Sequence, residues 1–193
     1  MMSSLKADFQ EVMDRVESGR EFGHASFEPI FYLVFSPSEI LEVKRQLPAF
    51  LAKLRNDGWD PQVFSVAKEI QAIFESAPAR IREIWLAADA KAPLEWDKTN
   101  KTLANTVANG ALQSRLEGRL AELEEVPKSI LLVTDLEALH PYMRIGSVES
   151  QLQGKFTVPT VFFYPGTRTG KTQLKFLGFY PEDGNYRSVH VGG

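Results

Sequence analysis

The spacing of apolar residues along the chain predicts an alternation of helices and short, buried strands. In residues 1–19 apolar positions recur every three or four residues, which predicts an amphipathic helix. Its apolar stripe is expected to dock on the chain's own core, with a groove on a partner as the alternative. Residues 29–35, PIFYLVF, form a short apolar run between turn-forming residues, which is typical of a strand covered on both faces.

A helix is predicted to begin directly after this strand. Ser36 can cap the free backbone N–H groups, Pro37 stands where a missing N–H costs nothing, and Glu39 can complete a capping box. Apolar residues then continue at helical spacing as far as Asn56-Asp57-Gly58, where the helix should end. Pro48 is expected to kink or split this helix, because a proline removes one of its hydrogen bonds.

The middle of the chain is predicted to be helical after one further strand, QVFSVA, which follows Pro61. Helices are expected over residues 67–77 and 79–90, and one longer helix near residues 100–125. Pro93 and the polar residues 97–100 form the only plausible linker, which is too short to divide the chain. We therefore expect one domain over residues 1–193, with a sheet-containing core in residues 29–193.

The last third contains two clear strands, SILLVTD at residues 129–135 and VPTVFFYPG at residues 158–166, with a helix through Val148 and Leu152 between them. Strands separated by helices require crossover connections, which favour a parallel sheet. LKFLGFYP, residues 174–181, follows too short a loop for a crossover and should pair antiparallel. The predicted fold class is α/β: one three-layer, Rossmann-like or P-loop-like domain with a mainly parallel sheet, helices on both faces and a C-terminal antiparallel hairpin.

Composition and charge narrow the class of protein. The 193 residues are 44% hydrophobic, and 25 acidic against 22 basic residues give a net charge of -3, so no general attraction to nucleic acid or an anionic membrane is expected. The chain has no cysteine, which agrees with a reducing cytoplasmic location. The charged N-terminus does not resemble an export signal, and no stretch reaches the roughly 20 apolar residues that span a bilayer. A soluble cytoplasmic protein is expected.

The segment Gly166-Thr167-Arg168-Thr169-Gly170-Lys171-Thr172 resembles a phosphate-binding P-loop. It has three residues between the glycines where the P-loop pattern needs four, and it leads into a segment that alternates like a strand, where a P-loop opens a helix. We therefore interpret it as a polar hairpin turn. The alternative is a degenerate nucleotide site formed by Asp135, Gly170, Lys171 and Thr172.

Asp135 follows a predicted central strand, at the edge of the sheet where α/β proteins place ligands and metal-binding acids. The favoured interpretation is that it caps the following helical turn. His24, His140 and His190 are scattered, and no nucleophile elbow, G-x-S-x-G, occurs. The sequence thus predicts no catalytic residues, no metal site and no cofactor.

Short motifs concentrated after residue 129 resemble the BrxB family of BREX phage-defence systems. The motifs are Thr134-Asp135, Leu139-His140-Pro141-Tyr142-Met143-Arg144, Val158-Pro159-Thr160-Val161, Phe163-Tyr164-Pro165-Gly166, Phe176-Leu177-Gly178 and Asn185-Tyr186-Arg187. The resemblance implies a small subunit encoded beside a methyltransferase, an ATPase and the phosphatase-like protein PglZ. It implies a subunit needed for host DNA methylation and phage restriction, with PglZ as the direct partner, and it carries no catalytic residues over to this chain.

A non-catalytic adaptor is therefore the favoured function, and a cryptic nucleotide-binding ATPase or switch of the same defence system is the alternative. An adaptor needs exposed aromatic residues, because interface hot spots favour Trp, Tyr and Arg. The aromatic candidates are Trp59, Trp85, Trp96, Phe179, Tyr180 and Tyr186, most of which are expected to be core. The turn-rich segment that ends this set places Phe179, Tyr180, Tyr186 and Arg187 beside a surface loop, so these four are the predicted partner-binding residues.

Overall fold

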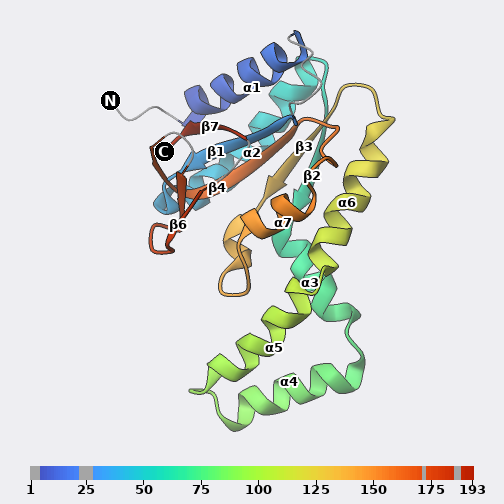
Figure 1. The fold of residues 1–193 in the computed structure, drawn as a ribbon, viewed down its shortest axis with the longest axis vertical. Helices are drawn as coiled ribbons and strands as arrows, with labels where there is room; N and C mark the ends of the chain where they lie inside the picture. Colours follow the sequence, from blue (N-terminus) through green and yellow to red (C-terminus); the bar gives the residue numbers. More distant parts are fainter. Residues whose placement is uncertain (1–4, 22–27, 171–172, 185–187) are drawn as a thin grey trace.

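The computed structural model describes residues 5–21, 28–170, 173–184 and 188–193, and it has a mainly parallel sheet between two layers of helices (Figure 1). The strands lie in the order β2-β3-β4-β1-β7, and every neighbouring pair in this order is parallel. Their bounds are Ile30–Phe35 (β1), Asp60–Ser65 (β2), Ser129–Thr134 (β3), Thr160–Thr169 (β4) and Val189–Gly192 (β7). The predicted α/β fold with a mainly parallel sheet is confirmed.

The predicted C-terminal hairpin is also present. Strand β4 continues beyond the parallel part of the sheet and pairs antiparallel with β5 (Gln173–Phe176), which pairs in turn with β6 (Glu182–Asp183). The strand predicted over residues 174–181 is shorter than expected. Leu177 and Gly178 both have positive φ angles, +52° and +76°, and such backbone cannot continue a strand.

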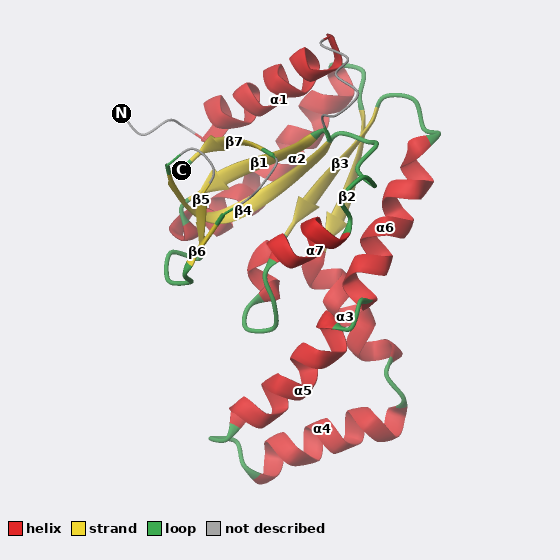
Figure 2. Cartoon of the chain, viewed as in Figure 1, coloured by secondary structure: helices red, strands yellow, loops and turns green. Residues whose placement is uncertain are grey.

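One face of the sheet is covered by α1 (Leu5–Glu21) and α2 (Ile40–Asn56), as Figure 2 shows. The apolar stripe of α1 is buried against β1 and β7, which confirms that this helix docks on the chain's own core. The ring of Phe9 in α1 stacks on that of Phe50 in α2 with centroids 4.0 Å apart. Contacts of this kind pack the two helices against one another as well as against the sheet.

The start of α2 follows the predicted capping box. The Ser36 hydroxyl accepts a hydrogen bond from the Ser38 amide, and the Glu39 carboxylate accepts one from the Ser36 amide at 3.0 Å. These residues form a short 3₁₀ turn, η1 (Pro37–Glu39), before the helix proper. The helix then runs through Pro48 without being split, and it ends as predicted near Gly58, whose φ is +85°.

The opposite face is covered by α3 (Val66–Ser76), α6 (Ala111–Glu124), the short turn η2 (Leu136–Leu139) and α7 (Ile145–Gln151). Four leucines of α6 are buried at helical spacing, and they pack toward β3 and α3: Leu112, Leu116, Leu120 and Leu123. Within the described ranges, no helix combines the length and apolar character that crossing a bilayer requires.

Two helices, α4 (Ala79–Lys91) and α5 (Trp96–Ala108), extend away from the sheet (Figure 1). Here the sequence-based expectations were wrong in two respects. The helix expected near residues 100–125 is divided into α5 and α6, because Gly110 adopts a left-handed conformation with φ +97°. Of the stretch expected to be a linker, Pro93 lies in the connection between α4 and α5, but residues 97–100 lie inside α5. Moreover, α4 has no buried residue, so its apolar stripe does not enter the core.

Candidate functional site

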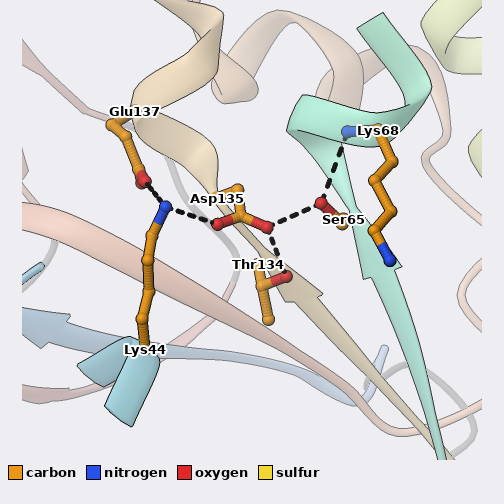
Figure 3. A network of polar contacts seen from close by, with 6 residues as sticks. All are labelled: Lys44, Ser65, Lys68, Thr134, Asp135 and Glu137. Atoms are coloured by element: carbon orange, nitrogen blue, oxygen red, sulfur yellow. Dashed lines mark hydrogen bonds and ion pairs between the residues drawn. The ribbon is translucent and has the colours of Figure 1, made fainter. Parts of the chain in front are cut away.

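Asp135, the best polar candidate of the sequence, receives bonds from three different parts of the fold (Figure 3). The Ser65 hydroxyl at the end of β2 donates to Asp135 Oδ2 at 2.6 Å, and the neighbouring Thr134 hydroxyl donates to the same oxygen at 3.1 Å. Lys44 Nζ, from α2, lies 2.8 Å from Oδ1. Asp135 itself has a left-handed backbone conformation, φ +59° and ψ +37°, which turns its carboxylate toward these donors.

Lys44 joins this carboxylate to a second one, Glu137, at 2.7 Å. Burial acts to raise the pKa of Asp135, but the hydrogen bonds from Lys44 and Ser65 outweigh it and hold that pKa below its usual value. Burial likewise acts to lower the pKa of Lys44, and its bonds to Asp135 and Glu137 outweigh that effect and raise the pKa. Both charges are therefore kept at neutral pH.

This arrangement changes the interpretation of Asp135. The residue occupies the N-cap position of η2 as predicted, but its side chain makes no capping hydrogen bond. Its two oxygens instead bind Lys44, Ser65 and Thr134. A metal ion or a phosphate-bound cation at Asp135 would have to displace Lys44. The contacts of Asp135 instead link α2, β2 and β3.

The other residues of the nucleotide-site alternative lie in the hairpin. Residues 166–169 belong to β4, Gly170 turns the chain with φ +80°, and β5 begins at Gln173. Lys171 and Thr172 lie outside the described residues. The segment after Gly170 leads into a strand and not into a helix, as the hairpin interpretation predicted. Phe162 of β4 pairs with Val133 of β3, so the residue two positions after Phe162 is level with Asp135. Gly170 lies six residues beyond that level, which is about 20 Å of extended chain.

A second group of candidates comes together at the surface. We call the side chains of His140, Phe179 and Tyr180 the aromatic surface. They are in mutual contact although His140 lies 40 positions before Tyr180 in the sequence. The rings of Phe179 and Tyr180 stack with centroids 4.9 Å apart, and Tyr180 Oη lies 2.6 Å from His140 Nδ1. Phe179 is nevertheless 63% exposed. The large aromatic side chain of Phe179 thus contacts two other rings while most of its surface faces solvent.

The aromatic surface packs on side chains of the sheet. The ring of Tyr180 packs on Phe176 of β5, and Phe176 packs on Tyr164 of β4, with centroids 5.4 and 5.5 Å apart. The His140-Pro141 peptide bond is cis and ends the turn that carries His140. Burial raises the pKa of Tyr180, while the charge of Arg144 opposes this, so the hydroxyl stays protonated and able to donate.

Beside the aromatic surface, the same two chain segments line an open cavity of about 540 Å³, to which Arg144, Glu149 and Asp183 contribute. Arg144 and Asp183 form an ion pair of 3.8 Å across it. Glu149 is buried, and its carboxylate accepts a hydrogen bond of 2.5 Å from the Tyr32 hydroxyl of β1. Burial raises the pKa of Glu149 to about 7, and the charges of Glu28 and Asp183 add to this effect.

The remaining candidates are distributed as follows. Tyr186 and Arg187 lie outside the described residues, so their prediction as partner-binding residues stays a prediction. Trp59 is buried, Trp85 packs edge-to-face on Phe74, and Trp96 is 56% exposed. Among the described residues, no group of three His, Cys, Asp or Glu could hold a metal ion.

One partner was missed by sequence reasoning. Lys44 is distant in sequence from Asp135, and its only signal was a polar residue among the apolar positions of a helix.

A family model described as "BREX protein BrxB" matches residues 81–191, more than half of the chain. The matched region contains β3, β4, the hairpin and the whole aromatic surface. No curated protein and no solved structure gives a significant match.

Proposed function

This chain belongs to the BrxB family of BREX proteins, and on that premise we propose that it is a non-catalytic adaptor that binds PglZ through its aromatic surface. Family membership makes the chain a component of a BREX phage-defence system. The adaptor role, the choice of PglZ and the requirement for host DNA methylation and phage restriction are our proposals. The methyltransferase and the ATPase of the system are further possible partners.

One observation carries the proposal: an exposed phenylalanine is stacked on a supported tyrosine within the region that the family model matches. Aromatic side chains dominate the energy of protein interfaces, because a large apolar area is buried with little loss of conformational entropy. The contact between Tyr180 and His140 already fixes the tyrosine ring before a partner arrives. Such preorganisation lowers the entropic cost of binding.

The direct test is binding of the purified full-length chain to purified PglZ. We expect a complex for the wild-type protein and a loss of affinity of about tenfold or more for Phe179→Ala, which is the range of an interface hot spot. Leu41→Ala is the matched control, because Leu41 is 72% exposed but lies on α2, outside the region that the family model matches. Equal affinity of the wild-type protein and Phe179→Ala, or no complex with PglZ at all, would contradict the proposal.

A cellular test uses a strain whose own copy of the gene is replaced by each variant. Phe179→Ala is expected to lower both host DNA methylation and phage restriction, while Leu41→Ala keeps both.

The rival function, a nucleotide-dependent ATPase or switch, makes a different prediction. It requires ATP or GTP with Mg²⁺ to raise the melting temperature of the wild-type protein and not that of Lys171→Ala, since a native-state ligand stabilises the fold. The adaptor proposal expects no such shift.

A further inference from the structure

The cavity beside the aromatic surface has a buried carboxylate in its lining. Glu149 of α7 is only 8% exposed, yet it lines this opening of about 540 Å³. Its Oε2 accepts the hydrogen bond of the Tyr32 hydroxyl, whereas no described residue donates to Oε1, which is in contact with solvent. A buried carboxylate ordinarily has a cation or several donors around it, because an unpaired charge is costly to bury. Glu149 thus has one oxygen available at the cavity.

The charged groups around Glu149 are mainly negative among the described residues. Burial raises the pKa of Glu149 to about 7, and the charges of Glu28, just before β1, and Asp183, in β6, raise it further. Arg144 lines the same cavity, but its ion pair is with Asp183, and it contributes nothing to the pKa of Glu149. A cation that enters the cavity would therefore meet a carboxylate that no described residue neutralises.

We propose that this cavity receives the end of a lysine or arginine side chain of the partner that binds the aromatic surface, with Glu149 as its counter-ion. This inference rests on the proposed function, because the same chain segments form both sites. Arg144, at the cavity, follows His140 by four residues. Asp183, also at the cavity, follows Tyr180 by three residues. A partner that covers the aromatic surface therefore lies directly beside the cavity.

The lining suits a long basic side chain. The volume of about 540 Å³ lies within the range of roughly 300–1,000 Å³ that is typical of ligand sites. Gly146 and Gly184 line the cavity without a side chain, and Met143 offers an apolar surface to the methylene groups of a lysine or arginine. The charged end then reaches Glu149, where burial strengthens an ion pair relative to one in water.

Binding to purified PglZ at pH 8, where Glu149 is ionised, tests its role as counter-ion. Glu149→Gln is expected to weaken binding about tenfold or more, because a neutral amide does not neutralise an incoming cation. Glutamine still accepts the hydrogen bond of Tyr32, and circular dichroism checks the fold. Glu17→Gln is the matched control, since it removes the same charge from an exposed position of α1 and should bind like the wild type. Equal affinity of the wild type and Glu149→Gln would overturn the proposal.

Proton release is a second readout, which a purely structural role of Glu149 would not produce. At pH 6 most of the free protein has a protonated Glu149, because its pKa is about 7. A bound cation requires the carboxylate, so binding of PglZ at pH 6 should release close to one proton, and the affinity should fall about tenfold between pH 8 and pH 6. Isothermal titration calorimetry in two buffers of different ionisation enthalpy counts the protons.

The proton count is compared between the wild type and Glu149→Gln, which should release about one proton fewer. Equal release by the two proteins would contradict the proposal. The titratable and charged groups that face Glu149, or lie next to its partner, are present in both proteins, so the difference isolates Glu149: Glu28, Tyr32, Arg144, Asp183 and His190.

A small cation tests the cavity without the partner. n-Butylammonium has the charge and the four-carbon stem of lysine, and n-butanol is its uncharged match. In NMR spectra of the ¹⁵N-labelled wild-type chain at pH 8, millimolar n-butylammonium is expected to shift the amide signals of Gly146, Ser147 and Gly184, whereas n-butanol is not. The shifts should be lost in Glu149→Gln. Equal shifts with the amine and the alcohol, or no saturable shift in the wild type, would overturn the proposal.

The results for the cavity are separable from those for the proposed function. PglZ binding that is lost in Phe179→Ala but unchanged in Glu149→Gln would overturn the cavity proposal alone. A wild-type chain that does not bind PglZ would contradict the proposed function. In that case, saturable binding of n-butylammonium that requires Glu149 would still support a basic side chain as the ligand of the cavity.

Discussion

Asp135 is expected to stabilise the fold by joining three elements at the carboxyl edge of the sheet. Asp135→Asn should keep the left-handed backbone, which asparagine tolerates, and remove the charge that Lys44 and Ser65 bind. We expect the free energy of unfolding to fall by about 1–2 kcal/mol, measured by urea denaturation at pH 7. Asp57→Asn is the control, since its pair with Lys53 is exposed and should contribute no more than about 0.5 kcal/mol.

The stabilisation contributed by the contacts of Asp135 has a defined pH dependence. Because the folded state lowers the pKa of Asp135 below its ordinary value of 3.8, the stabilisation is complete above that pH and is lost as pH falls through the folded pKa. The difference between wild type and Asp135→Asn should therefore be constant near neutral pH and shrink only below about pH 4. A difference that instead changes between pH 6 and 8 would contradict this assignment.

Glu149 is predicted to have the opposite pH dependence. Its pKa rises from 4.5 to about 7 on folding, so between these values the folded chain binds a proton that the unfolded chain does not. Stability contributed by this residue is present below pH 4.5 and is lost as pH rises to about 7. Glu149→Gln keeps an acceptor for the Tyr32 hydroxyl, and it should be more stable than the wild type at pH 8 by on the order of 2 kcal/mol.

The effect of Glu149 must be measured as a difference in the free energy of unfolding between the wild type and Glu149→Gln. The reason is that His190 contributes a pH dependence of opposite sign to both proteins. Burial, together with the charge of Arg168, lowers the pKa of His190 from 6.5 to about 4, so its contribution to stability is lost as pH falls through that range. The two effects partly cancel in the wild-type pH profile. Urea denaturation of both proteins at pH 5 and pH 8 isolates Glu149, and an equal difference at the two pH values would rule out its titration.

Among the elements, the break between α5 and α6 gives a matched pair of glycines. Gly110 has φ +97°, whereas Gly118 lies inside α6, and a Cβ at either position would meet nothing within 4 Å. Gly110→Ala should therefore destabilise the fold by about 1–2 kcal/mol through backbone strain alone. Gly118→Ala should stabilise it by about 0.5–1 kcal/mol, because alanine favours a helix. Thermal unfolding followed by circular dichroism measures both, and shifts of the same sign would contradict the assignment.

The elements that the sequence predicts best are those whose local pattern agrees with their tertiary environment. The strands at residues 30–35 and 129–134, the capping box at Ser36 and the hairpin after β4 all follow from local spacing. The break at Gly110 was missed because apolar residues keep helical spacing across it. The exposure of α4 was missed for a related reason: its periodicity is that of a core helix, but the next helices leave it outside the core.

In the candidate sites, too, local sequence patterns predicted the position of some residues but not their contacts with residues distant in sequence. The position of Asp135 follows from its place after a strand, but Lys44 lies 91 residues earlier and only the packing of α2 on the sheet brings it there. Phe179 and Tyr180 were predicted as partner-binding residues from the turn residues near them. Phe179 is exposed and Tyr180 is partly buried, and their binding role stays a prediction. Their contact with His140 depends on the order of strands, which local periodicity does not specify.

For the whole molecule, the aromatic surface and the helical extension lie on different parts of the fold (Figure 1). The aromatic surface rests on β4 and β5, whereas α4 and α5 extend away from the sheet.

The prediction of one domain over residues 1–193 implies that the extension is coupled to the sheet. Helix α5 contacts both α3 and α6, whose apolar residues, including Val107 of α5, belong to one buried cluster with the sheet. We therefore expect the extension and the sheet to unfold together. A chain with Trp85→Phe and Trp96→Phe keeps Trp59, on the α2 side of the sheet, as its single fluorophore.

In that variant, urea denaturation followed by Trp59 fluorescence and by circular dichroism at the helix band should give one midpoint, since coincident probes are the mark of a two-state transition. The helix signal includes α4 and α5, so independent melting of the extension would lower it before the fluorescence changes. Such a separation would mean that the extension unfolds independently of the sheet. Coincident transitions would mean that the extension and the sheet unfold as one cooperative unit.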